Sequence, residues 1–129
     1  MRSRQKALLV ADLALAKKAE DIVILDMRKI SNITDFFIIA TATSGRQAKT
    51  IADDIEQGLL NAEEVVSAVE GYQDSSWVII DAYDVVAHIF NREIREFYNL
   101  EGLWGDAPRI KLWQKKNKKR SSKKTLKRK

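Results

Sequence analysis

The fold is decided by the stretch WVIIDAYDVVAHIF, residues Trp77 to Phe90. It contains two apolar segments, Trp77–Asp81 and Asp84–Phe90, whose β-branched residues are typical of buried strands. Only Ala82 and Tyr83 separate these segments, and such a short connection predicts an antiparallel hairpin. The same stretch carries two aspartates and the chain's only histidine, so it is also the first place to look for a site.

Helices and further strands are predicted on both sides of the hairpin. Ile51, Ile55 and Leu59 recur at helical spacing, and Ser44 stands where it can cap that helix. Long helices between buried strands favour a mixed five-stranded sheet flanked by helices, an α/β fold. The remaining predicted elements are a helix over about 4–19, strands Asp21–Met27, Asp35–Thr41 and Ser67–Glu70, a helix over Arg46–Leu60 and a last helix over Asn91–Tyr98.

Length and composition exclude several classes of protein. The 129 residues are enough for one domain, and 45% apolar content is ordinary for a soluble globular chain. No apolar run approaches the ~20 residues that cross a bilayer, and no signal-peptide pattern opens the chain. The absence of cysteine excludes disulfides, a thiolate nucleophile and cysteine-bound zinc, and it fits a reducing, cytoplasmic location.

The net charge of +5 conceals two regions of opposite charge. Residues 115–129 carry ten Lys or Arg and no acid, whereas residues 1–114 carry 13 basic and 18 acidic residues, a net charge of −5. We therefore predict a folded acidic domain over 1–114 and a disordered basic tail over 115–129.

A catalytic site is hard to assemble from this sequence. Asp81 and Asp84 flank the predicted turn, but no third metal ligand accompanies them, and turn-forming aspartates are common at hairpin ends. His88 has no cysteine to activate, and Gly45 alone is not a phosphate-binding loop. We predict no catalytic residues, cofactor or metal, with a magnesium-dependent, nucleotidyltransferase-like enzyme using the two aspartates as the alternative.

The aromatic residues of this stretch allow two readings. Trp77 and His88 are either packed side chains of a sheet surface or part of a binding surface, because tryptophan and tyrosine are enriched in binding hot spots. Tyr83, at the tip of the hairpin, is the aromatic residue with the strongest claim to be exposed. Its contact role requires that the side chain not be buried in the core.

Several further segments of the chain form a recognisable series. They are ITDFFIIAT (Ile33–Thr41), TSGRQ (Thr43–Gln47), VEG (Val69–Gly71), DVVAHIF (Asp84–Phe90), Arg95 and YNLEGLWGDAP (Tyr98–Pro108). Taken in this order, they resemble the ribosomal silencing factor family, whose members are also called RsfS or Iojap-like proteins. One departure is Ala82-Tyr83, where the family often has glycine or other small turn residues.

The resemblance implies a fold similar to nucleotidyltransferases without their catalytic signature. It also implies binding to the large ribosomal subunit at ribosomal protein L-fourteen, on the face where the small subunit docks. A factor bound there would block subunit association and repress translation. The family resemblance further implies a homodimer when the protein is free, and no membrane partner is expected.

These expectations assign roles to particular side chains. An acidic domain repels RNA and favours a basic protein, so Asp81 and Asp84 would accept hydrogen bonds from partner cations. Trp77, Tyr83 and His88 would supply contact area, while Arg95 and Tyr98 either support the hairpin or touch the partner. The tail is either a solubilising end or a ribosomal RNA contact, and in a third hypothesis it acts alone as an RNA-binding module. Its candidate contact residues are Lys115, Lys116, Lys118, Lys119 and Arg120.

Overall fold

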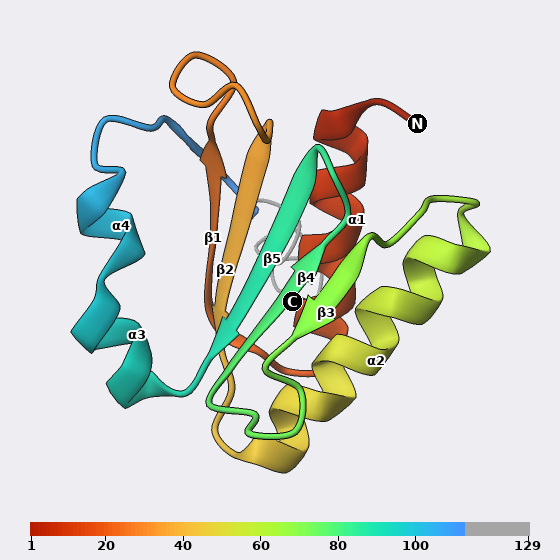
Figure 1. Ribbon diagram of the computed structural model, residues 1–129, viewed down its shortest axis with the longest axis vertical. Coiled ribbons are helices and arrows are strands. Elements are labelled where there is room, and N and C mark those ends of the chain that lie inside the picture. Colours follow the sequence, from red (N-terminus) through yellow and green to blue (C-terminus); the bar gives the residue numbers. More distant parts are fainter. Residues whose placement is uncertain (113–129) are drawn as a thin grey trace, which may run out of the picture.

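The computed structural model describes residues 1–112, which form one mixed sheet with helices on both faces (Figure 1). The strand order is β3-β4-β5-β2-β1-β6, with β2 and β5 parallel at the centre and every other pair antiparallel. The elements are α1 (Ser3–Ala16), β1 (Glu20–Asp26), β2 (Phe36–Thr41), α2 (Gly45–Asn61), β3 (Ala68–Glu70), β4 (Trp77–Asp81), β5 (Val85–Phe90), α3 (Arg92–Tyr98), α4 (Leu100–Leu103) and β6 (Arg109–Ile110).

The predicted α/β class is confirmed, but the sheet has six strands and not five. The additional strand, β6, is only two residues long and pairs with Ile24 and Leu25 of β1. The chain is already held there because the Asp26 N–H donates to the Pro108 carbonyl at 2.7 Å. Two residues cannot display the alternation that identifies a strand in sequence, so β6 was missed.

Helices α1 and α2 seal one face of the sheet. The predicted cap of α2 is confirmed, because the Gln47 N–H donates to the Ser44 hydroxyl at 3.0 Å. The apolar stripe of α2, including Ile51, Ile55 and Leu59, is buried against the sheet together with α1. This side is therefore a closed and mostly aliphatic core, which also buries the ring of Phe36.

Helices α3 and α4 cover part of the opposite face (Figure 1). Phe90 and Ile39 are fully buried there, and Trp104 packs against the same small cluster. Asn99 joins the two helices in a left-handed conformation, with φ of 47°, and its side chain accepts from the Gly102 N–H. No helix within residues 1–112 is long and apolar enough to span a membrane.

The hairpin turn lies one residue further along than the sequence predicts. Ala82 is buried, and its N–H donates to the Val85 carbonyl at 2.9 Å, so it continues the ladder of β4. The two turn residues are consequently Tyr83 and Asp84, not Ala82 and Tyr83. An alanine in the core looks the same in sequence as an alanine in a turn, and only packing separates the two.

Candidate partner-binding surface on the sheet

The face of the sheet that carries α3 and α4 is only partly covered. Phe37 of β2, Trp77 and Ile79 of β4 and Val86 of β5 are half-buried, with His88 among them. Strand pairing sets Phe37 beside Val86 and Ile79 beside His88. We call these five side chains the open sheet face.

Trp77 is held in one orientation by its neighbours. Its indole Nε1–H donates to Nδ1 of His88 at 3.1 Å, and its ring stacks on Phe90 at 4.8 Å between centroids. The Tyr98 ring also contacts Trp77, with 4.9 Å between the ring centroids, and Tyr98 is half-exposed. An aromatic side chain that is already ordered loses little conformational entropy on binding, which favours its use as an anchor.

His88 is buried, with 6% of its surface exposed, and burial lowers its pKa to about 4. The imidazole is therefore neutral at pH 7. Because Nδ1 accepts from Trp77, the ring proton resides on Nε2. Within residues 1–112, Nε2 is a buried nitrogen that makes no hydrogen bond, and the Phe37 and His88 rings form a T-shaped pair with 4.7 Å between their centroids.

The tip of the hairpin presents Tyr83, whose side chain is 60% exposed. This satisfies the exposure that its predicted contact role requires, and the role itself stays a prediction. Its backbone has φ of 71°, a conformation that tyrosine rarely adopts. The Asp81 carboxylate stabilises the turn by accepting from the Tyr83 N–H at 3.0 Å. Alternation along β4 places Asp81 on the side of Trp77 and Ile79, at the rim of the open sheet face.

The second aspartate of the hairpin faces α1. Asp84 accepts from the Lys6 ammonium at 2.8 Å, and the same ammonium donates to the Ala82 carbonyl at 2.7 Å and pairs with Glu64 at 3.1 Å. Lys6 is 3% exposed. One oxygen of Asp84 is thus already paired with a cation, and the two aspartates do not form a joint carboxylate site. No group of three or more potential metal ligands occurs among residues 1–112.

The structure also separates the roles left open for the residues after β5. Arg95 is buried, donating to Glu101 at 2.6 Å and to the Thr41 hydroxyl at 2.7 Å, so it ties the two helices to the sheet. Tyr98 flanks Trp77, and Trp104 is half-buried in the cluster beneath α4. The candidate RNA contacts Lys115, Lys116, Lys118, Lys119 and Arg120 lie outside the described residues.

The sequence did not lead us to expect Phe37 and Ile79 in the open sheet face, nor Lys6 as a support of the hairpin beside it. Lys6 did leave a signal, because it shares its helical stripe with Val10 and Ala14 and so interrupts an apolar face. A lysine at such a position indicates a buried carboxylate partner. Phe37 and Ile79 could have been placed only with the strand register.

Several known protein sequences match most of this chain. The family model described as "RsfS: Ribosomal silencing factor during starvation" matches residues 1–129. The ribosomal silencing factor RsfS of Halalkalibacterium halodurans is 44% identical over 96 residues, covering 74% of this chain and 82% of that protein. The Bacillus subtilis RsfS is 44% identical over 92 residues, with 71% and 78% covered. The chloroplastic protein Iojap of Zea mays is 36% identical over 107 residues, 82% of this chain and 46% of that protein.

Solved structures share the fold. A crystal structure of a Chromobacterium violaceum protein superposes with a TM-score of 0.80 at 32% identity, covering 81% of this chain and 88% of that one. A Bacillus halodurans crystal structure gives a TM-score of 0.75 at 36% identity, with 84% and 99% covered. The order of elements, the sequence matches and the shared fold agree, and the chain therefore belongs to the ribosomal silencing factor (RsfS) family.

Proposed function

We propose that this protein represses translation in the cytoplasm by binding the large ribosomal subunit at ribosomal protein L-fourteen and obstructing its association with the small subunit. The observation that carries the proposal is the open sheet face, where an oriented Trp77 stands beside a half-buried apolar surface. Membership of the ribosomal silencing factor family supports the ribosome as the partner.

The chemistry of the surface suits a basic protein partner. Residues 1–112 hold the same 13 basic and 18 acidic residues as the predicted domain, so their net charge of −5 repels RNA and attracts cationic proteins. Asp81 stands at the rim of the open sheet face, and Tyr83 projects from the tip beside it. Aromatic anchors at the centre with polar groups at the rim are the usual anatomy of a protein interface.

Occupation of the subunit face is sufficient for this role, and no reaction is needed. At fifty times its dissociation constant, a competitor lowers the free-site population about fiftyfold. The magnesium-dependent alternative is disfavoured because Lys6 already compensates Asp84. A divalent cation at Asp84 would have to displace or repel that ammonium.

Two further parts of the proposal concern assembly. The basic tail would contact ribosomal RNA near the docked domain and add affinity through its tether. We also expect the free protein to be a homodimer, as implied by the family resemblance. Deleting residues 115–129 should flatten the salt dependence of ribosome binding. If the slope of affinity against salt concentration is unchanged, the tail does not contact ribosomal RNA.

The decisive experiment is a pull-down with purified large subunits, followed by a subunit-association assay. The variant Asp81→Arg with Tyr83→Ala should bind at least about tenfold more weakly and lose the ability to keep the subunits apart. Asp54→Arg on α2 makes the same charge change on the other side of the sheet and should bind normally. If the double variant still blocks association at wild-type concentrations, the open sheet face and its rim are not the binding site.

A further inference from the structure

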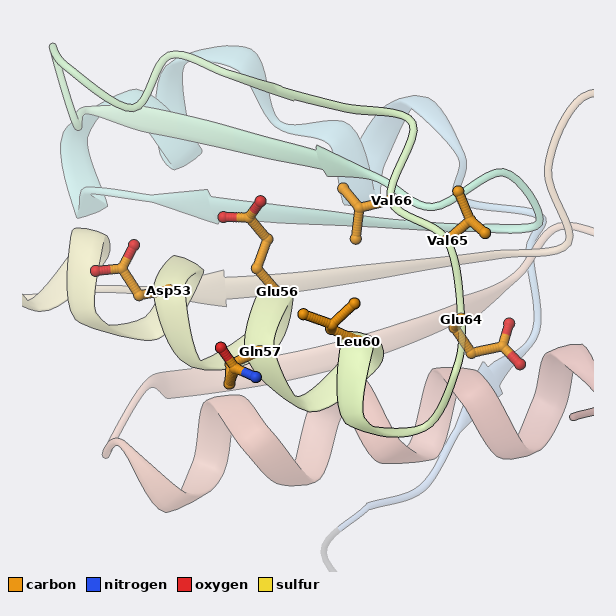
Figure 2. A pocket seen from close by; sticks show the side chains of 7 residues that line it. All are labelled: Asp53, Glu56, Gln57, Leu60, Glu64, Val65 and Val66. Atoms are coloured by element: carbon orange, nitrogen blue, oxygen red, sulfur yellow. The ribbon is translucent and has the colours of Figure 1, made fainter.

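A second surface lies on the opposite side of the sheet, in a groove between α2 and the segment that leads into β3 (Figure 2). The groove has a volume of about 620 Å³. Leu60 and Val65 are 65% and 63% exposed, which is unusual for two aliphatic side chains lining one depression. Its lining residues are Asp53, Glu56, Gln57, Leu60, Glu64, Val65 and Val66.

The groove lies within the most acidic part of the chain. Between Thr50 and Asn91 there are nine Asp or Glu residues and no Lys or Arg. Of the lining carboxylates, Glu64 is paired with Lys6 and Asp53 accepts from the Tyr72 hydroxyl. Glu56 makes no ion pair within residues 1–112, and Figure 2 shows its carboxylate extending away from α2. The groove therefore combines unpaired negative charge with exposed aliphatic surface.

We propose that this groove binds the chain's own C-terminal segment, residues 115–129. That segment has ten Lys or Arg, no acid and one aliphatic residue, Leu126. Its cations match the carboxylates of the groove, and Leu126 matches the exposed side chains of Leu60 and Val65. The inference does not rest on the proposed function, since it concerns the opposite face of the sheet.

The geometry permits this docking within one molecule. Leu112 is buried in the core beneath α1 and α2, so the chain leaves the described region on the groove's side of the sheet. Strands β6 and β3 are the two edges of the sheet, five spacings or about 24 Å apart. The fourteen residues from Leu112 to Leu126 span up to about 46 Å when extended, roughly twice that distance.

Weak contacts are sufficient, because a tethered segment has an effective concentration in the millimolar range. Exposed ion pairs contribute about 0–1 kcal/mol each and are screened by salt. The docked state should accordingly be sensitive to salt. While it is docked in the groove, the C-terminal segment would also be unavailable to RNA, until a polyanion displaced it from the groove.

The test uses the full chain, labelled at one position. The protein has no cysteine, so Ser122→Cys provides a single site for a nitroxide spin label. In ~10 mM salt, where the Debye length is about 30 Å, the amide NMR signals of Leu60, Val65 and Val66 should fall by roughly a factor of two or more. They should recover in ~1 M salt, where that length is about 3 Å.

Two matched variants show whether the effect belongs to the groove. Glu56→Lys should abolish the broadening, whereas Glu96→Lys, the same change on exposed α3, should leave it intact. Absence of broadening at low salt, or equal broadening in both variants, overturns the proposal. A mixture of isotope-labelled protein and spin-labelled, isotope-free protein gives a further check. If the groove signals fall equally there, the occupant is the tail of a second copy, and docking within one chain is wrong.

Discussion

The two faces of the sheet are built from alternate residues of the same strands, yet they are covered to different extents. On β4, Ile80 points into the core under α1 and α2 and is 1% exposed, while its neighbour Ile79 is half-buried on the open sheet face. The closed face is mostly aliphatic, with Phe36 as a buried ring, whereas the open face is richer in aromatic side chains and incompletely covered. Covered surface stabilises the fold, and the uncovered surface remains available for a partner.

The largest difference between the faces should appear in a pair of truncations. Ile80→Ala removes buried methyl groups from a closed core and should lower the free energy of unfolding by about 3 kcal/mol. Ile79→Ala should cost roughly 1 kcal/mol, because solvent already reaches that side chain. Urea denaturation measures both. Equal losses would mean that the two faces are packed equally well.

A substitution on the open sheet face should affect partner binding more than it affects the stability of the fold. Ile79→Ala is expected to weaken binding to purified large subunits, while Ile80→Ala, where it remains folded, leaves the affinity unchanged.

Lys6 connects the closed face to the hairpin, and its loss should be the next largest effect. Lys6→Met removes the cation paired with Asp84 and leaves Glu64 with the Met1 ammonium at 3.6 Å, which should cost about 2 kcal/mol of stability. The estimate lies below that for a fully buried pair because both carboxylates are partly exposed. Adding Asp84→Asn should restore part of the loss, and thermal unfolding of the wild type, the two single variants and the double variant would show it. Strict additivity would argue against a coupled cluster.

His88 makes the open face sensitive to pH. Its pKa of about 4 in the folded state lies below the ordinary 6.5, so the unfolded chain binds more protons between these values. The contribution of His88 to the free energy of unfolding is therefore fully present above pH 6.5, and it is lost as the pH falls toward 4. The loss from this group between pH 7 and pH 5 should be about 2 kcal/mol.

The control for this effect is His88→Asn, whose amide oxygen can still accept from Trp77. Its stability, measured by urea denaturation at both pH values, should decline less steeply than that of the wild type. Parallel pH profiles for the two proteins would show that the histidine is not the titrating group.

The smallest effect is expected at the hairpin tip. Tyr83→Gly removes the strain of a positive φ at a non-glycine residue and should stabilise the protein by about 0.5–1 kcal/mol. The same change should weaken binding to the large subunit, since it removes the exposed ring. A variant that is both less stable and equally good at binding would contradict the idea that strain is retained here for contact.

Much of this architecture could be read from residue patterns. The helical stripe of Ile51, Ile55 and Leu59, the Ser44 cap and the hairpin were all predicted, because each depends on neighbours within a few residues. The site was predicted less well. Asp81 and Asp84 have the same side chain and lie three residues apart, and nothing local indicates that only one of them faces α1 and its lysine.

The sequence by itself determined strands β1 to β5, helices α1 to α3, the opposite charges of residues 1–114 and 115–129, and the family, since these follow from local propensity, composition and residue order. Tertiary structure alone decided that Trp77 is oriented by His88, that Lys6 neutralises Asp84, and that Arg95 is a support. The physical reason is that these contacts join residues 11, 78 and 54 positions apart. Such contacts depend on the register of strands and the packing of helices, which no short window of sequence contains.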